Sequence, residues 1–292
     1  MNRPTEDIPV YSIESLKSTR QEEVREFDFF RFEYFVHDID HLRVPHRHHF
    51  YTFLLVTMGD GSHDIDFTTY ALKPNRLFLI APGQVHAWNQ LSHVKGFVVL
   101  FTDSFVALSK GRKIMAAWPL FRMDQPCYLD LKPAEVALWV EEFKYMEQET
   151  NRTDDFSRDA IFYSIGTLLV RASRLYHHLL YKNKTGTTDL LVTFQELIEK
   201  HFMEWRAPRE YAARMNLTAN YLNSICKKKS GKSAGELIRQ RVLLEAKRLL
   251  AHTTLTVAEI AYKLNFEDNS YFGRYFKKYT GLTPETFRLQ KQ

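Results

Sequence analysis

The apolar and polar positions along the 292-residue chain follow three successive patterns. From about Phe29 to Leu129, short apolar or alternating runs are broken by turn residues, for example at 58–61 and 82–83. Short runs at this spacing predict an antiparallel barrel or sandwich. The run Phe97–Phe101 predicts a buried strand, because it is far shorter than the roughly 20 apolar residues that cross a bilayer.

After Pro133 the apolar positions change to a helical period. A first helix is expected to bury one face, formed by Val136, Trp139, Val140, Phe143 and Met146. A second helix, roughly Phe156–Leu180, is apolar on more than one face, which indicates burial against several neighbours, with a subunit interface among the alternatives. The polar stretch Tyr181–Thr188 has no apolar period and is expected to be a linker.

Beyond this stretch the chain repeats itself. The sequence AARMNL at Ala212–Leu217 returns as AYKLNF at Ala261–Phe266, and the residues after each copy keep the same order of aromatic, basic and turn residues. Each copy predicts a helix-turn-helix: a small residue where two helices cross steeply, then Asn216 or Asn265, which tolerates the positive φ of a tight turn. The same order occurring twice indicates a true repeat.

The residues around each turn predict where the second helix of each copy begins and ends. Thr218 and Asp268 are suitable N-caps, and Gly231 and Gly281 fit the left-handed position that ends a helix. Between the copies, Glu236–His252 is expected to form a rigid connecting helix that fixes the distance between the two units.

The second copy also resembles a known signature. From Ala258 to Arg288, the spacing of Ile260-Ala261 and Thr283-Pro284 is similar to that of the AraC/XylS family of bacterial transcription regulators. The resemblance extends over about 193–289. It implies a cytoplasmic regulator that binds promoter DNA, responds to a small-molecule effector, contacts RNA polymerase and forms a homodimer.

By that resemblance, the second helix of each unit reads DNA bases and its last turn contacts phosphates. The residues expected to face bases are Ala219, Asn220, Asn223, Ser224, Asn269, Ser270, Gly273 and Arg274. The residues expected to contact phosphate are Lys227, Lys228, Lys277 and Lys278. Arg274 suits a guanine edge, and Asn220 or Asn223 an adenine edge. The residues expected to point inward are Tyr221, Leu222 and Ile225.

Charge is divided unevenly along the chain. The formal net charge is +5, but residues 185–292 carry 18 Lys and Arg against 11 Asp and Glu, whereas residues 1–184 carry 22 against 24. The positive field therefore belongs to the segment expected to meet a polyanion, although basic surface alone also serves solubility. Only two cysteines and a polar start without a secretion core agree with a reducing cytoplasm and no membrane partner.

Histidines of the N-terminal region gather in two short segments. Val44–Tyr51 and Pro82–Asn89 resemble the two motifs of a cupin barrel, the fold in which regulators of this kind bind an effector. The residues expected to line the effector pocket are His46, His48, Tyr51, His86 and Trp88. A cupin metalloenzyme has a carboxylate a few residues after the His pair. Here the corresponding stretch, Phe50–Phe53, contains no acidic residue. No metal, cofactor or catalytic residue is therefore expected.

Two alternatives stay open beside the ligand-responsive regulator. One is a metal-dependent oxygenase or isomerase with a DNA-binding tail, in which the histidines hold a metal. The other is a plain DNA-binding protein whose barrel binds nothing. The apolar segment Ile8–Tyr11 adds a further hypothesis, an arm that closes over the effector.

The sequence thus predicts an α+β multidomain protein. A cupin-like antiparallel β-barrel at residues 1–130 is followed by helices at 131–181 that are expected to dimerise. A linker at 182–190 leads to an all-α domain at 191–292, in which a connecting helix joins two helix-turn-helix units.

Overall fold

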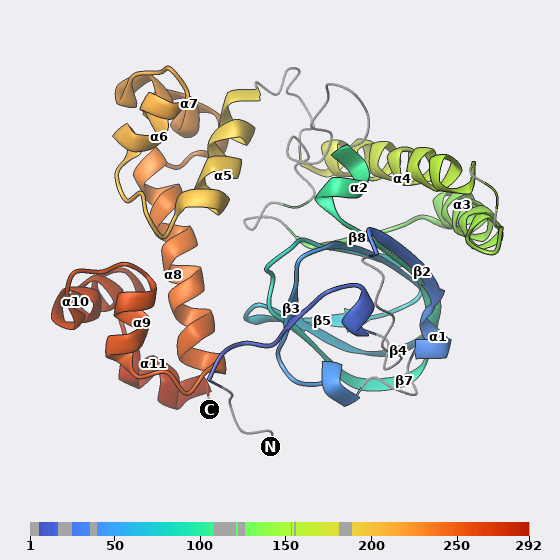
Figure 1. Ribbon diagram of the computed structural model, residues 1–292, viewed down its shortest axis with the longest axis horizontal. Helices are drawn as coiled ribbons and strands as arrows, with labels where there is room; N and C mark the ends of the chain where they lie inside the picture. The colour runs from blue at the N-terminus through green and yellow to red at the C-terminus, as the bar shows by residue number, and fades with distance from the viewer. Residues whose placement is uncertain are drawn as a thin grey trace. The chain divides into compact units, whose positions relative to one another are not determined.

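The structure is a computed structural model, and it describes residues 6–16, 25–35, 40–107, 121, 126–152, 154, 156–180 and 189–291 (Figure 1). The chain divides into two compact units, residues 9–185 and residues 186–292 together with 1–8. The expected linker at Tyr181–Thr188 lies outside the described residues. None of the helices in the described ranges is both long enough and apolar enough to span a membrane.

A six-stranded sheet forms the centre of the larger unit. Its strands are β2 (Phe27–Arg31), β4 (Tyr51–Ile65), β5 (Thr68–Leu72), β6 (Arg76–Ile80), β7 (His86–Phe101) and β8 (Tyr128–Asp130). The strand order is β2-β7-β4-β6-β8, with β5 on β4, and every pair is antiparallel. The predicted antiparallel sheet domain is confirmed.

The sequence predicted an antiparallel barrel or sandwich, and the strand pairings among the described residues form one antiparallel sheet without a pairing that closes it into a barrel. Two short strands, β1 (Val10–Tyr11) and β3 (Arg47–His48), pair in parallel with each other and form a separate two-stranded sheet. Directly before β3, His46 forms an isolated antiparallel bridge with His86 of β7, so main-chain hydrogen bonds connect the small sheet to the large one. The segment expected to act as an arm is thus part of a small sheet beside the histidines.

Bulges in the long antiparallel pair β4–β7 decide which side chains face inward. The register between the two strands shifts three times between Val56 and Ser62. At Gly59, with φ of 91°, an added Cβ would lie 2.5 Å from Val94 Cα, so glycine is required there. In a regular strand Leu54 and His63 would face opposite sides, because side chains alternate. The bulges bring both to the same side.

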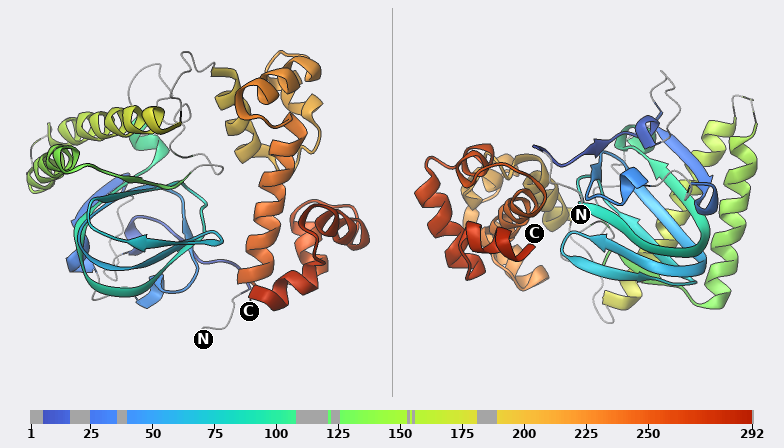
Figure 2. Two further views of the ribbon diagram at one scale, coloured as in Figure 1. Left: turned by 180° about the vertical axis from the view of Figure 1, so that it is seen from behind. Right: turned by 90° about the horizontal axis from the view of Figure 1, so that it is seen from below.

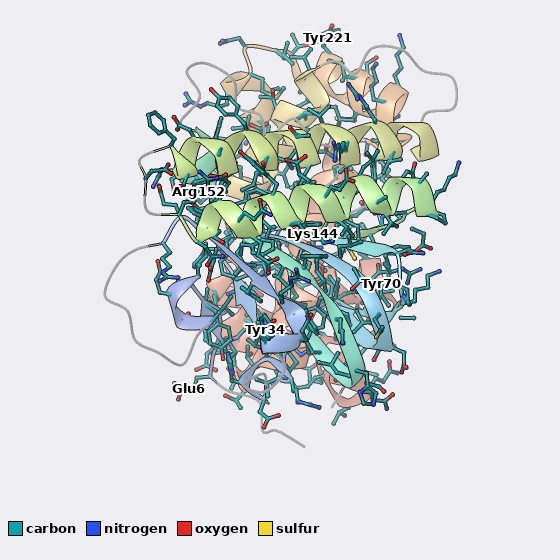
Figure 3. The ribbon with its side chains drawn as sticks, turned by 90° about the vertical axis from the view of Figure 1, so that its right-hand side faces the viewer. Glu6, Tyr34, Tyr70, Lys144, Arg152 and Tyr221 are labelled. Carbon is teal, nitrogen blue, oxygen red and sulfur yellow. The ribbon has the colours of Figure 1, made fainter. Side chains whose placement is uncertain are left out.

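Both faces of the sheet are buried. In β4, Phe53 and Leu55 point to one face and Leu54 and Val56 to the other. Helices α3 (Pro133–Thr150) and α4 (Ser157–Leu180) lie side by side across the first face (Figures 1 and 3). The buried side chains of α3 include Trp139, Phe143 and Met146, as predicted.

Short elements cover the second face of the sheet. They are η1 (Glu14–Leu16), α1 (Phe32–Phe35) and η3 (Asp40–Leu42), while α2 (Asp103–Ala107) follows β7 on the other side. Leu16, Phe32 and Leu42 are buried against Leu54, Val98 and Leu100 of the sheet. This apolar layer encloses the space in which the histidines lie.

The smaller unit consists of seven helices among its described residues. They are α5 (Asp189–His201), α6 (Pro208–Arg214), α7 (Ala219–Ser230), α8 (Ala234–His252), α9 (Val257–Lys263), α10 (Asn269–Thr280) and α11 (Pro284–Lys291). The long helix α8 contacts α5, α6 and α7 and also α9 and α11, and it connects two groups of short helices (Figure 2). The predicted arrangement of two helix-turn-helix units joined by a connecting helix is confirmed.

Candidate DNA-binding and effector sites

The two helix-turn-helix units have turns of the same construction. In Ala212–Leu217 the last N–H donates to the first carbonyl oxygen at 2.8 Å, and in Ala261–Phe266 the same bond measures 2.9 Å. Asn216 and Asn265 occupy the left-handed region, with φ of 55° and 59°. An asparagine tolerates this region better than other residues that have a Cβ, so the local chemistry explains both turns.

The second helix of each unit begins and ends in the same way. In α7 the Thr218 hydroxyl accepts a hydrogen bond from the Tyr221 N–H at 3.2 Å, and in α10 the Asp268 carboxylate accepts one from the Tyr271 N–H at 2.6 Å. Each helix ends at a left-handed glycine, with φ of 73° in the first unit and 80° in the second. These are the caps that the sequence predicts.

Most of the residues expected to face DNA are accessible in the free protein. The exposed ones among those expected to face bases are Asn220, Ser224, Asn269, Ser270 and Arg274. Ala219, Asn223 and Gly273 are half-buried. Lys227, Lys228, Lys277 and Lys278 are all exposed in the last turns of α7 and α10. The two helices therefore present polar side chains near their N-termini and cations near their C-termini.

Asn223 has a structural partner that the sequence did not reveal. Its side-chain oxygen accepts a hydrogen bond from the main-chain N–H of Ala234 at 3.1 Å. Ala234 is the first residue of α8, where helix N–H groups lack partners within the helix. Asn223 thus links α7, the second helix of the first unit, to the connecting helix α8.

The expectation that Tyr221 points inward is wrong. Its side chain is 54% exposed, and its counterpart Tyr271 in the second unit is 51% exposed. The inward positions of α7 are Leu222 and Cys226, which are four residues apart and fully buried. Tyr221 is one position away, which turns it out of that buried face. Both tyrosines therefore lie on the accessible side of α7 and α10.

In the larger unit, four histidines meet on the covered face of the sheet. Main-chain hydrogen bonds of 3.0 Å and 2.8 Å join His46 to His86, and their rings lie 4.2 Å apart. The His48 ring lies 4.9 Å from that of His86. His63 Nε2 lies 2.9 Å from His86 Nδ1, and its ring stacks on Trp88 at 3.6 Å. The sequence reasoning missed His63, because the bulges that turn it inward leave no obvious pattern.

Burial keeps these imidazoles neutral. Desolvation lowers the pKa of His46 to about 4 and that of His48 to about 3, and the pKa values of His63 and His86 fall well below the usual value for the same reason. Three of the buried nitrogens, His48 Nδ1, His63 Nδ1 and His86 Nε2, have no hydrogen-bond partner within the described part of the chain. A buried polar nitrogen without a hydrogen-bond partner lowers the stability of the fold unless a ligand or a water molecule bonds to it.

A cavity lies beside this cluster, and we call it the histidine cavity. Its polar lining consists of His46, His48, His86 and Thr52, and Trp88 forms part of its wall. The remaining lining is apolar and includes Leu54, Ile80 and Leu100 of the sheet and Leu16, Phe32 and Leu42 of the covering elements. The structure therefore joins four of the five residues that the sequence assigned to an effector pocket.

Tyr51, the fifth residue, lies on the opposite face of the sheet. Its ring packs against Phe101 and Phe121, and its hydroxyl donates to Asp103 at 3.1 Å. Strand alternation accounts for this placement: Thr52 lines the histidine cavity, so its neighbour in β4 points to the other side.

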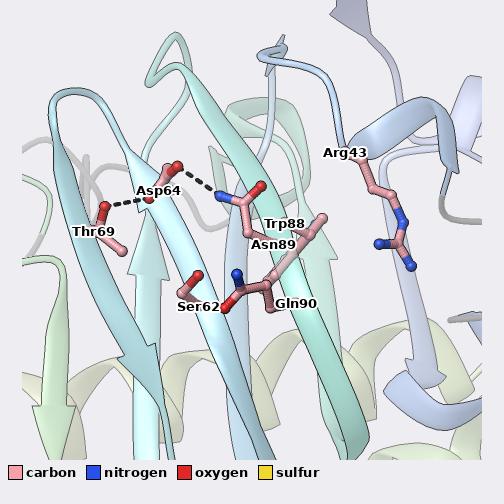
Figure 4. Close-up of a pocket in the computed structure, with 7 residues that line it drawn as sticks. All are labelled: Arg43, Ser62, Asp64, Thr69, Trp88, Asn89 and Gln90. Atoms are coloured by element: carbon pink, nitrogen blue, oxygen red, sulfur yellow. Dashed lines mark hydrogen bonds between the residues drawn. The ribbon is translucent and has the colours of Figure 1, made fainter. Parts of the chain in front are cut away.

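A second, polar hollow opens on the outer side of β4, β5 and β7 (Figure 4). Asp64 lies at its centre and accepts hydrogen bonds from Thr69 Oγ1 at 2.5 Å and from Asn89 Nδ2 at 2.6 Å. Trp88 contributes to the walls of both this hollow and the histidine cavity. Within the described ranges, no three His, Cys, Asp or Glu side chains are placed to hold a metal ion together.

Two helix-turn-helix units on one connecting helix, together with a sheet domain that encloses a cavity, define a class: DNA-binding regulators with a ligand-binding domain. Comparison with known families agrees. Residues 211–290 match the family model described as a helix-turn-helix domain, and residues 32–165 match that of the AraC-like ligand binding domain. The chain belongs to the AraC/XylS family of transcription regulators.

Curated relatives match over most of their length. The HTH-type transcriptional activator RhaS of Escherichia coli is 23% identical over 252 residues, which cover 83% of this chain and 86% of the relative. The activator RhaR of Yersinia pseudotuberculosis is 22% identical over 254 residues, 84% of each chain. Among solved structures, ToxT from Vibrio cholerae covers 92% of this chain with 14% identity and a TM-score of 0.41.

Proposed function

We propose that this regulator reads a two-part DNA site with α7 and α10 and that a small molecule in the histidine cavity controls it. In this proposal, Asn220 and Ser224 of the first unit and Asn269, Ser270 and Arg274 of the second face the bases. The exposed lysines at the ends of α7 and α10 contact phosphates and set the affinity.

The observation that carries the proposal is the structural repeat itself. Both units have the same turn bond, the same left-handed asparagine, the same type of N-cap and the same left-handed glycine. A single such unit also occurs in proteins that do not read sequence. Two copies held on one helix, each with exposed polar residues at the start of its second helix, fit the reading of two neighbouring major-groove segments.

The DNA part is tested by selecting binding sites from a random duplex library with the full-length protein. Wild-type protein is expected to select two conserved segments, one for each recognition helix. One double variant, Asn220→Ala and Ser224→Ala, changes α7, and a second, Ser270→Ala and Arg274→Ala, changes α10. Each should lose the sequence preference at one segment and keep it at the other. Loss of both preferences in either variant would contradict the assignment.

We also propose that the protein forms a homodimer through α3 and α4. Large apolar side chains stay exposed on these helices: Leu138 is 50%, Tyr163 70% and Val170 43% exposed. Exposed apolar side chains that gather on one pair of helices are typical of an interaction surface. Sedimentation of a Tyr163→Asp, Val170→Asp variant should show monomer where the wild type is dimeric. Tyr34→Asp, at a 78% exposed tyrosine of α1, is the matched control and should stay dimeric.

In this proposal the larger unit binds its ligand without converting it, and the bound regulator activates transcription through RNA polymerase in the cytoplasm. The support is that RhaS and RhaR are named as activators. Transcription in vitro from a promoter that contains the selected site tests activation. A transcript level that rises with the protein supports an activator, and a level that falls would make it a repressor.

A further inference from the structure

The chemistry of the histidine cavity restricts what it can bind. Apart from its three histidines, none of its lining residues is ionisable. The histidines themselves are almost completely buried, with exposed fractions of 1% for His46, 2% for His48 and 5% for His86. A ligand charge placed here would lose its hydration without meeting a fixed opposite charge, which is costly.

The apolar walls restrict the ligand further. Phe30, Phe32, Phe50 and Trp88 contribute aromatic side chains, and Leu54 and Leu100 contribute aliphatic ones. Only the three histidines, Thr52 and the indole N–H of Trp88 offer polar side-chain atoms among these lining residues. A sugar has hydroxyl groups all around its ring, so most of them would be buried without partners against these walls.

The hydrogen-bonding groups of the cluster are of a particular kind. His46 Nδ1 lies 2.9 Å from the Val44 carbonyl oxygen, which only accepts, so this nitrogen carries the proton and Nε2 is left as an acceptor in the neutral ring. In the His63–His86 pair one nitrogen donates and the other accepts. His86 Nε2, which has no partner among the described residues, therefore donates or accepts according to the tautomer of the pair.

We infer that the effector is an uncharged, mainly aromatic small molecule with a single hydroxyl-type group, which bonds to His46 and His86 while its ring lies between the phenylalanines and Trp88. A hydroxyl is both a donor and an acceptor, so it can donate to Nε2 of His46 and accept from Nε2 of His86 in the tautomer in which that nitrogen carries the proton. This inference rests on the proposed function, because it assumes that the histidine cavity is the effector site. The open space there is about 30 Å³, less than an aromatic ring needs, so binding also requires the side chains that line the cavity to move apart.

The polar hollow of Figure 4 is the competing location for a ligand with many hydroxyl groups. Its lining includes Arg43, Asp64, Asn89 and Gln90, which suit a sugar better than the histidine cavity does. Asp64 already accepts two internal hydrogen bonds, and Arg43 pairs with Asp40 at 3.1 Å. Two buried nitrogens without a partner among the described residues, His48 Nδ1 and His86 Nε2, belong to residues that line the histidine cavity, which is why we assign the effector there.

The test compares matched probes by the melting temperature of the full-length protein. The probes are 4-ethylphenol, ethylbenzene without the hydroxyl, 4-ethylbenzoate with a charge, L-rhamnose with many hydroxyls, and zinc chloride. We expect 4-ethylphenol to raise the melting temperature by several degrees at a concentration far above its Kd, since binding to the folded state alone stabilises it. Ethylbenzene should have a smaller effect, and the other three none.

Three variants locate the binding. His86→Phe removes the polar end, Leu100→Phe fills the cavity, and Asp64→Ala alters the polar hollow. The phenol effect should vanish in Leu100→Phe, fall to that of ethylbenzene in His86→Phe and persist in Asp64→Ala. His46→Phe, which removes the other ring that bonds the hydroxyl, replaces His86→Phe if the latter fails to fold. It should weaken the phenol effect while leaving that of ethylbenzene unchanged.

The other outcomes separate the two levels of the inference. Stabilisation by 4-ethylbenzoate, L-rhamnose or zinc that is lost in Leu100→Phe would keep the histidine cavity as the effector site and overturn the ligand class. Stabilisation by L-rhamnose that is lost only in Asp64→Ala would move the site to the polar hollow and overturn both. No stabilisation by any probe would overturn the ligand class as well, because 4-ethylphenol is a member of it.

Discussion

The guanidinium of Arg206 donates a hydrogen bond to the main-chain oxygen of Leu264. Arg206 precedes α6 in the first helix-turn-helix unit, and Leu264 is the C-cap of α9 in the second, so this bond joins the two units directly. The guanidinium also lies 4.5 Å from the centroid of the Phe266 ring. Helix α8 joins the units through the chain, and Arg206 adds a point of attachment that restrains the angle between the recognition helices.

Replacing Arg206 should separate affinity for two-part sites from affinity for single ones. Arg206→Ala is expected to lower the free energy of unfolding by roughly 1–3 kcal/mol, since it removes a charged hydrogen bond and a cation–π contact. Fluorescence anisotropy should show weaker binding to a duplex with both segments and unchanged binding to a duplex with one. Arg209→Ala, at an exposed position nearby, is the control. Equal losses on both duplexes would instead mark Arg206 as a phosphate contact.

Arg274 and Lys278 should differ in the kind of binding energy they contribute. Arg274→Ala is expected to reduce discrimination at one base pair by roughly 1–3 kcal/mol, because a guanine edge loses its partner. Lys278→Ala should weaken binding to all sequences alike and reduce the salt dependence by about one phosphate contact. Competition titrations with single-base operator variants at several salt concentrations measure both. If Arg274→Ala weakens binding to specific and random DNA by the same free energy, Arg274 does not read a base.

The two asparagines of α7 should respond differently to the same change. Asn223→Ala removes the partner of the Ala234 N–H, and we expect it to lower the free energy of unfolding by about 1 kcal/mol, as for other lost helix caps. Base preference should stay. Asn220→Ala should leave stability unchanged and alter the preference at one base. Urea unfolding and site selection with both variants test this pair, and a changed base preference in Asn223→Ala would show that its bond to α8 opens on DNA.

Acid should destabilise the larger unit through its buried histidines. The unfolded chain binds protons near pH 6.5, whereas burial lowers the pKa of His46 to about 4 and of His48 to about 3 in the fold. Below about pH 6.5 the unfolded state therefore binds more protons than the folded state. The contribution of these histidines to the free energy of unfolding is complete above about pH 7 and decreases as the pH falls. At pH 5 the loss should be about 2 kcal/mol for each of the two.

Urea unfolding followed by tryptophan fluorescence between pH 8 and pH 5 measures this loss. The titratable groups near the His46 and His48 rings are His41, His49, His63, His86 and Tyr11, and none of the described residues places a carboxylate against either ring. A His46→Gln, His48→Gln variant should show a shallower decline with acid. An unchanged slope would place the pH dependence elsewhere in the protein.

The sequence predicted the DNA-binding unit better than the ligand-binding unit, and the reason is the range of the interactions. A left-handed turn at Asn216 or a cap at Thr218 depends on neighbours within a few residues, so the local pattern is enough. The position of His63 depends on bulges between two strands that are distant in the sequence, and that of Tyr51 depends on which face of the sheet the helices cover. The bond from Asn223 to Ala234 joins two elements, and it is invisible to a reading of either helix alone.

Helix α8 has 19 residues. Each residue of an α-helix adds about 1.5 Å of length and about 100° of rotation. A single inserted residue would therefore turn the second recognition helix away from the groove faced by the first and break the contact of Arg206 with Leu264. Substitutions on the outer side of α8 leave this geometry intact. Across related proteins that read the same two-part site, insertions and deletions in this helix should consequently be rarer than substitutions.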